Sequence, residues 1–135
     1  MINVAVLGYG VVGSGVVEVI DTNKISISGR AGEDIIVKKI LDIADFPDDP
    51  YRKLLTKNAD EIFEDNSIKI IVETIGGTGV AFEFTKRAFL SGKHVVSSNK
   101  ELVALHGPEL LKMAKENNVN YLFEASVGGG IPIIR

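Results

Sequence analysis

The fold is decided by the stretch Asn3-Val-Ala-Val-Leu-Gly-Tyr-Gly-Val-Val-Gly-Ser-Gly15. Residues 2–7 are apolar and rich in β-branched side chains, which predicts a strand buried on both faces. Three glycines with G-x-G-x-x-G spacing follow at once, and a valine-rich, helix-like stretch continues to Ile20. This strand–turn–helix context favours a dinucleotide site over an ordinary glycine-rich turn.

Each of the three glycines is explained by a different physical requirement of the turn. Gly8 lets the chain reverse tightly, Gly10 lets backbone approach a pyrophosphate, and Gly13 lets the helix pack close to the sheet. The helix then begins with unpaired N–H groups and a positive dipole end facing the phosphates. We therefore expect the backbone amides of Gly10, Val11 and Val12 to face the pyrophosphate of a bound coenzyme.

Composition sets limits on the rest of the chain. Its 135 residues, 45% hydrophobic and 24% charged, suit one globular domain over residues 1–135. A net charge of −3 without a basic patch argues against nucleic acid as a partner. The absence of cysteine rules out disulfides and thiolate chemistry, and the first apolar run is too short for a signal peptide or a membrane span. We expect a cytoplasmic protein.

The apolar patterns alternate between strand and helix. Strands are expected at residues 2–7, 35–41, 69–75, 94–97 and 120–125, and helices at 80–90 and 99–117, the last broken near Gly107-Pro108. Residues 51–65 suggest one or two short helices, whereas Thr22–Glu33 and Asp45–Pro50 are expected to be connections.

This alternation predicts an α/β fold: a doubly wound, Rossmann-type parallel sheet with helices on both faces. Numbered along the chain, the five strands are expected in the spatial order 3-2-1-4-5. Ligands of such sheets bind outside the carboxyl ends of the strands, at the switch point between strands 1 and 4. Three turns should converge there, at Gly8–Gly13, Thr74–Gly77 and Ser97–Lys100.

Two further segments resemble a known family. Ser97-Ser-Asn-Lys-Glu-Leu-Val-Ala104 with His106-Gly107, and Phe123-Glu-Ala-Ser-Val-Gly-Gly-Gly-Ile-Pro132, are similar to homoserine dehydrogenase, as is Glu73-Thr74. The resemblance spans all 135 residues but only the family's N-terminal, coenzyme-binding domain. The final apolar segment, Ile131–Arg135, agrees with a longer protein whose substrate domain is absent here.

The resemblance implies NAD(P)-dependent interconversion of L-homoserine and L-aspartate 4-semialdehyde, a step of threonine and methionine biosynthesis. It implies that Lys100 is catalytic and meets both nicotinamide and substrate, where a fixed cation would stabilise negative charge on oxygen. The alternative is a surface lysine in the first turn of a helix, although a cation there opposes the helix dipole. The isolated domain should bind coenzyme without turnover, and the full-length enzyme is expected to be a homo-oligomer.

Other coenzyme contacts follow from the expected fold. Thr74 and Ile75 should lie along the coenzyme, with Ser98 and Lys100 nearer the nicotinamide, although the Thr74 hydroxyl could simply satisfy a loop amide. Asp42 is the expected partner of the ribose 2′-hydroxyl, and Asp45 is its rival. Since no Arg or Lys follows strand 2 directly, we expect NAD in preference to NADP.

The remaining polar residues leave alternatives open. The resemblance implies a sodium ion held by the backbone carbonyls of Glu124, Val127, Gly129 and Ile131, whereas the same glycines could form only a hinge. His94 and His106 are expected to be structural or surface residues. Glu73 and Glu101 could form an acid–base pair, but Glu101 more simply complements a helix N-terminus.

Two rival functions remain at this stage. A regulatory module that senses a dinucleotide would need the glycine turn, but it would need neither a cation at the switch point nor a tail leading into a catalytic domain. An oxidoreductase for a different amino-acid-derived carbonyl would keep all of these features, because the fold does not select the substrate.

Overall fold

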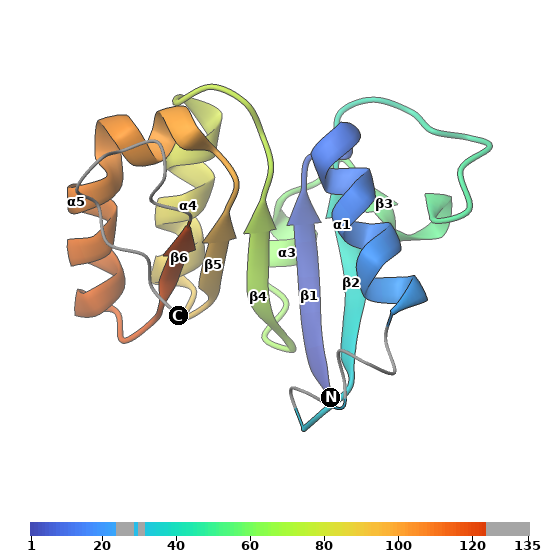
Figure 1. Cartoon of the computed structure of the whole chain (residues 1–135), viewed down its shortest axis with the longest axis horizontal. Coiled ribbons are helices and arrows are strands. Elements are labelled where there is room, and N and C mark those ends of the chain that lie inside the picture. The colour runs from blue at the N-terminus through green and yellow to red at the C-terminus, as the bar shows by residue number, and fades with distance from the viewer. Residues whose placement is uncertain (24–28, 30–31, 124–135) are drawn as a thin grey trace.

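The computed structural model describes residues 1–23, 29 and 32–123, which form a six-stranded parallel sheet in the order β3-β2-β1-β4-β5-β6 (Figure 1). The strands are β1 (Ile2–Leu7), β2 (Ile35–Leu41), β3 (Leu55–Thr56), β4 (Ile68–Glu73), β5 (His94–Ser97) and β6 (Tyr121–Phe123). The helices are α1 (Val11–Thr22), the 3-10 turn η1 (Arg52–Leu54), α3 (Asp60–Phe63), α4 (Val80–Leu90) and α5 (Lys100–Glu116). None of these helices is long and apolar enough to cross a membrane.

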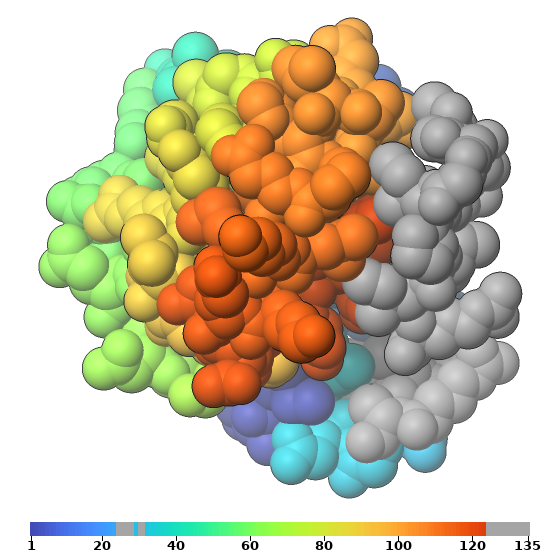
Figure 2. Space-filling view, turned by 90° about the vertical axis from the view of Figure 1, so that its left-hand side faces the viewer, coloured from blue at the N-terminus to red at the C-terminus, as the bar shows by residue number. Residues whose placement is uncertain are grey.

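Both faces of the sheet are covered, and β1 illustrates why. Successive side chains of a strand point to opposite faces. Ala5 and Leu7 join a core that includes residues of α3, α4 and α5, whereas Val6 joins a second core with Val17 of α1. In Figure 1, α1 lies over β1 and β2, while Figure 2 shows α5 covering the side of the molecule beside β5 and β6. The doubly wound fold predicted from the sequence is confirmed.

One strand escaped the sequence analysis. β3 contains only Leu55 and Thr56, inside a segment whose apolar residues had suggested helices, and it pairs with the end of β2. The strand expected third along the chain is therefore β4, and it pairs with β1 rather than with β2, so the expected neighbour was wrong. The switch point lies between β1 and β4, with β2 on the opposite side of β1.

A second correction concerns α5. Gly107-Pro108 was expected to break this helix, because proline lacks an N–H and its ring crowds the preceding turn. The helix instead runs without interruption from Lys100 to Glu116, with Pro108 inside it. Residues on both sides of Pro108, including Leu102 and Leu110, are buried in the same core. Tertiary packing of this face outweighs the local cost of the proline.

Candidate functional site

The glycine turn between β1 and α1 has the geometry that its sequence predicts. Gly8 has φ +92°, a conformation that other residues rarely adopt. A Cβ on Gly13 would lie 1.9 Å from the carbonyl oxygen of Gly8, so only glycine lets α1 approach β1 this closely. A Cβ on Gly10 would meet nothing within 4 Å, which leaves this side of the turn open. No side chain caps the start of α1 among the described residues.

A cleft of about 560 Å³ opens at the carboxyl ends of β1, β2 and β4. It is lined by Gly8, Gly10, Leu41, Asp42, Ile43, Lys57, Ala59, Thr74, Ile75, Gly76, Val80 and Phe84. Five residues predicted to bind coenzyme are therefore brought to one cavity: Gly8, Gly10, Asp42, Thr74 and Ile75. Ser98 and Lys100 do not line this cleft, and both are exposed at the end of β5 and the start of α5.

Thr74 braces the glycine turn. Its hydroxyl lies 2.7 Å from the carbonyl oxygen of Leu7 and 3.0 Å from that of Gly8, and its backbone N–H donates to the Leu7 carbonyl at 2.9 Å. This arrangement favours the structural alternative for the hydroxyl, although its partners are carbonyls rather than an amide. The side chain of Thr74 thus fixes the cleft wall that it also lines.

Asp42 stands at the end of β2 and connects two loops. Its Oδ2 accepts a hydrogen bond from the backbone N–H of Tyr9 at 2.8 Å, and its Oδ1 accepts one from Ala44 at 2.8 Å. Its rival Asp45 does not line the cleft and forms an exposed ion pair with Lys57 at 2.8 Å. Of the two carboxylates, Asp42 has the better position for a ribose hydroxyl.

Tyr9, inside the glycine turn, is a residue that the sequence analysis overlooked. Its ring is buried edge-on against Phe46, and its hydroxyl donates to Asp49 at 2.7 Å. Burial, reinforced by the hydrogen bond to Asp49, raises the pKa of Tyr9 well above its usual range. The Tyr9 side chain therefore ties the glycine turn to the loop after β2, and the only signal for this role was an aromatic residue between two glycines.

The turn that carries Lys100 is held against the end of β4. Asn99 caps α5 by accepting a hydrogen bond from the Leu102 amide at 3.0 Å, and its side-chain nitrogen donates to the carbonyls of Ile75 at 2.7 Å and Gly77 at 2.6 Å. The Ser98 amide donates to the Glu73 carbonyl at 3.1 Å. The predicted convergence of the three turns is confirmed, with Thr74 and Asn99 as the connecting side chains.

Glu73 is fully buried at the end of β4, where its Oε1 accepts a hydrogen bond from the Ser97 hydroxyl at 2.8 Å. Burial raises the pKa of this carboxyl, and the bond from Ser97 only partly opposes the shift. Glu101 is exposed in the first turn of α5. A buried carboxyl and a surface carboxylate do not make the acid–base pair that was one alternative.

The two histidines have protein partners. Nδ1 of His94 accepts the Asn120 amide at 3.0 Å, and the ring of His106 stacks on Phe82 with centroids 4.0 Å apart. Among the described residues no group of three His, Cys, Asp or Glu could hold a metal ion. The proposed sodium donors Glu124, Val127, Gly129 and Ile131 lie outside the described residues.

Chemically, this edge can hold a diphosphate against the start of α1, with an apolar wall and a carboxylate on the β2 side. Residues 8–124 match the protein family described as "Homoserine dehydrogenase, NAD binding domain". The homoserine dehydrogenase of Bacillus subtilis is 39% identical over 138 residues, and that of Neisseria gonorrhoeae is 36% identical over 145. These alignments cover 99% of this chain and 32% and 31% of the two relatives, so the chain spans about a third of their length.

Solved structures agree with the sequence comparison. The S. aureus homoserine dehydrogenase at pH 7.5 superposes with a TM-score of 0.84 and 40% identity, covering 93% of this chain and 32% of that one. The enzyme from Thiobacillus denitrificans superposes with a TM-score of 0.81 and 38% identity, covering 93% of this chain and 30% of that one.

Proposed function

Because the chain belongs to the homoserine dehydrogenase NAD-binding domain family, we propose that it is the coenzyme-binding domain of an enzyme that interconverts L-homoserine and L-aspartate 4-semialdehyde. This reaction would serve threonine and methionine biosynthesis in the cytoplasm, within a homo-oligomer. The substrate domain of that enzyme would follow residues 1–135 in the protein.

The observation that carries the proposal is the contrast between Gly10 and Gly13. Gly13 is required for helix–sheet packing, whereas the open space beside Gly10 has no structural explanation within the described residues. A diphosphate resting on the amides of Gly10, Val11 and Val12 would use that space. Asp42 would accept a ribose hydroxyl, and Ile75 would contact the coenzyme beyond the pyrophosphate.

Lys100 would provide positive charge on the nicotinamide side. It is the first residue of α5 and is exposed, and Asn99 fixes the turn that precedes it. When bound, the coenzyme supplies hydride-transfer chemistry. The lysine would stabilise the negative charge that develops on the substrate oxygen, and Ser98 would lie near the same end. A substrate domain would have to cover this exposed turn to exclude water.

We propose NAD rather than NADP as the preferred coenzyme. The Asp42 carboxylate would accept a hydrogen bond from a 2′-hydroxyl but repel a 2′-phosphate. Lys57 lines the same cleft, but Asp45 pairs with it and offsets its charge. Dissociation constants for NADH and NADPH, measured side by side, would test this preference, and tighter binding of NADPH would contradict it.

The binding site is tested by Gly10→Ala, with Gly15→Ala as the matched control. Both added methyl groups meet nothing within 4 Å, so both variants should keep the fold. Gly10→Ala should weaken NADH at least about tenfold because the methyl group occupies the space of the pyrophosphate. Gly15→Ala should leave NADH affinity unchanged. Equal affinities of the two variants in a fluorescence titration would refute the site.

Catalysis is tested separately. Residues 1–135 should bind NADH without oxidising L-homoserine, because the proposed reaction needs a substrate domain. Measurable oxidation of L-homoserine by this chain alone would show that the catalytic assignment is wrong. In a full-length enzyme that contains this domain, Lys100→Ala should lower turnover by orders of magnitude, and near-normal turnover would remove Lys100 from the mechanism.

A further inference from the structure

A buried polar cluster lies behind the turn that carries Lys100. Glu73 ends β4, Ser97 ends β5, and both are buried together with Asn99 and with Tyr121 on β6. Neither Glu73 Oε2 nor the hydroxyl of Tyr121 has a hydrogen-bond partner in the described part of the chain. Glu73 lies at the carboxyl end of β4, Tyr121 is the first residue of β6, and neither residue lines the cleft.

Such an arrangement is costly for a core position. A buried oxygen without a partner loses the hydrogen bond to water that it has in the unfolded chain. An apolar side chain of similar volume at position 73 would avoid this loss and would fit the surrounding core. Stability alone therefore does not explain a glutamate at this place.

The contacts of Glu73 lead to the coenzyme side of the molecule. Its side chain accepts a hydrogen bond from the Ser97 hydroxyl at 2.8 Å, and the same hydroxyl accepts one from the backbone N–H of Asn99 at 3.1 Å. Asn99 then holds the carbonyls of Ile75 and Gly77. Glu73 is thus the inner end of a chain of hydrogen bonds that fixes both turns beyond the pyrophosphate site.

The two ends of the coenzyme should depend on this chain differently. In the proposed function, Asp42 and the start of α1 hold the adenosine and pyrophosphate on the β2 side of β1. The nicotinamide must then extend to the other side, toward Ile75–Gly77 and Ser98–Lys100. A shift of the turns held by Glu73 would therefore weaken only the contacts to the nicotinamide half of the coenzyme.

We infer that Glu73 is a positioning residue for the nicotinamide half of the site, acting through Ser97 and Asn99. This inference rests on the proposed function. A carboxyl at position 73 orients the Ser97 hydroxyl, the hydroxyl orients the Asn99 backbone, and Asn99 fixes the turns on both sides of the nicotinamide.

The test compares NADH with ADP-ribose, which lacks the nicotinamide, in this chain and three variants. Glu73→Met should weaken NADH about tenfold, leave ADP-ribose within about twofold, and unfold at the same or a higher temperature than the parent. Glu73→Gln keeps an acceptor for Ser97 and should bind both ligands like the parent. Ser97→Ala removes the bridging hydroxyl and should reproduce the selective loss of NADH affinity even if Glu73→Met does not fold.

The outcomes separate this inference from the proposed function. A parent chain that binds neither ligand would overturn both. A parent that binds both ligands, with Glu73→Met and Ser97→Ala weakening them equally or not at all, would overturn only the positioning role. Loss of NADH affinity in Glu73→Gln, equal to that in Glu73→Met, would also contradict it, because the acceptor would then be irrelevant.

Discussion

The two edges of the sheet each bury one group that carries charge in water, and they treat it differently. Lys93, just before β5 at the amino edge, is 2% exposed, and its Nζ donates to the carbonyls of Asp65 at 2.7 Å and Ile68 at 2.8 Å. Burial lowers the pKa of Lys93, as it raises that of Glu73 at the carboxyl edge. Lys93 nevertheless has partners, whereas one oxygen of Glu73 has none among the described residues.

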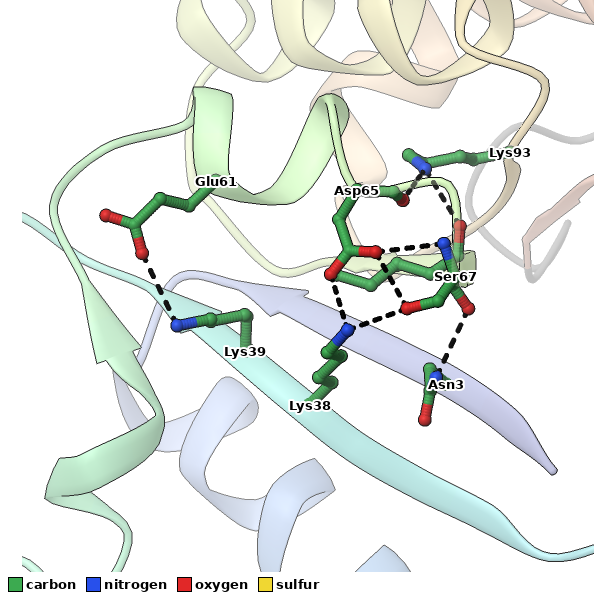
Figure 3. Close-up of polar contacts among 8 residues, drawn as sticks. Asn3, Lys38, Lys39, Glu61, Asp65, Ser67 and Lys93 are labelled. Atoms are coloured by element: carbon green, nitrogen blue, oxygen red, sulfur yellow. Dashed lines mark hydrogen bonds and ion pairs between the residues drawn. The ribbon is translucent and has the colours of Figure 1, made fainter.

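The amino edge extends this pattern of complete pairing (Figure 3). Asp65 Oδ2 accepts from Lys38 at 2.7 Å, and Oδ1 accepts from the Ser67 amide at 2.9 Å and the Ser67 hydroxyl at 2.7 Å. Asn3 donates to the Ser67 carbonyl at 3.3 Å. These contacts tie β1 and the middle of β2 to the turn before β4, and nearer the carboxyl end of β2 Lys39 pairs with Glu61.

The difference indicates what each edge is for. Polar groups at the amino edge satisfy one another, which is typical of groups that stabilise the fold. Within the described residues at the carboxyl edge, no side chain caps the start of α1, the space beside Gly10 is open, and Glu73 Oε2 has no hydrogen-bond partner. Departures from complete pairing gather where a ligand would bind, as expected when function competes with stability.

The largest expected effect on stability is at Lys93. Lys93→Met should lower the free energy of unfolding by about 3 kcal/mol, because it removes the ammonium that donates to the carbonyls of Asp65 and Ile68. NADH affinity should stay unchanged, since the amino edge lies at the opposite end of the strands from the proposed coenzyme site. Lys69→Met, at an exposed lysine of β4, is the control and should change stability by less than about 0.5 kcal/mol. Weaker NADH binding in folded Lys93→Met would break the proposed division between the two edges.

A smaller loss is expected for Asp65→Asn. Three donors to the Asp65 carboxylate, above all Lys38, hold its pKa well below the usual range. A lowered pKa in the folded state stabilises the protein above the unfolded pKa of about 4, and this stabilisation is lost as the pH falls. The variant should therefore cost about 2 kcal/mol at pH 7.

The cost should shrink by about 1 kcal/mol at pH 3, as followed by denaturant unfolding at several pH values. Asp48→Asn, at an exposed aspartate, is the control and should cost little at any pH. A cost for Asp65→Asn that did not vary with pH would mean that its charge is not what the amino edge uses.

The sequence predicted some elements of the fold and missed others. The strands around the glycine turn were predictable because buried strands give continuous apolar runs, and Gly8, Gly10 and Gly13 have local backbone reasons. β3 was missed because a strand of two residues is too short to show an alternation of apolar and polar side chains. The unbroken α5 was missed because the packing that keeps it helical at Pro108 is a tertiary effect. The pairing of β4 with β1 could not be predicted either, because the pattern of apolar residues does not say which strands are neighbours.

The site was predictable to a similar extent. Asp42 and Thr74 were predicted as site residues because they directly follow strands, where a parallel sheet gathers its ligands, and both line the cleft. The hydroxyl partners of Thr74, the anchoring role of Tyr9 and the burial of Glu73 depend on residues 24 to 67 positions away, and no local pattern encodes such partners. The hydrogen bonds from Lys93 to the carbonyls of Asp65 and Ile68 could not be predicted for the same reason.

Glu73→Gln should show the opposite pH dependence from Asp65→Asn. Because burial raises the pKa of Glu73 in the folded state, its carboxyl stabilises the fold most below the unfolded pKa, and this advantage is lost as the pH rises toward the folded pKa. Glutamine does not titrate, so the stability of Glu73→Gln relative to the parent should rise with pH from about 4.5, by up to about 1.4 kcal/mol per unit. Parallel stability curves for Glu73→Gln and the parent would mean that Glu73 has ordinary hydration, and the contrast between the two edges would then disappear.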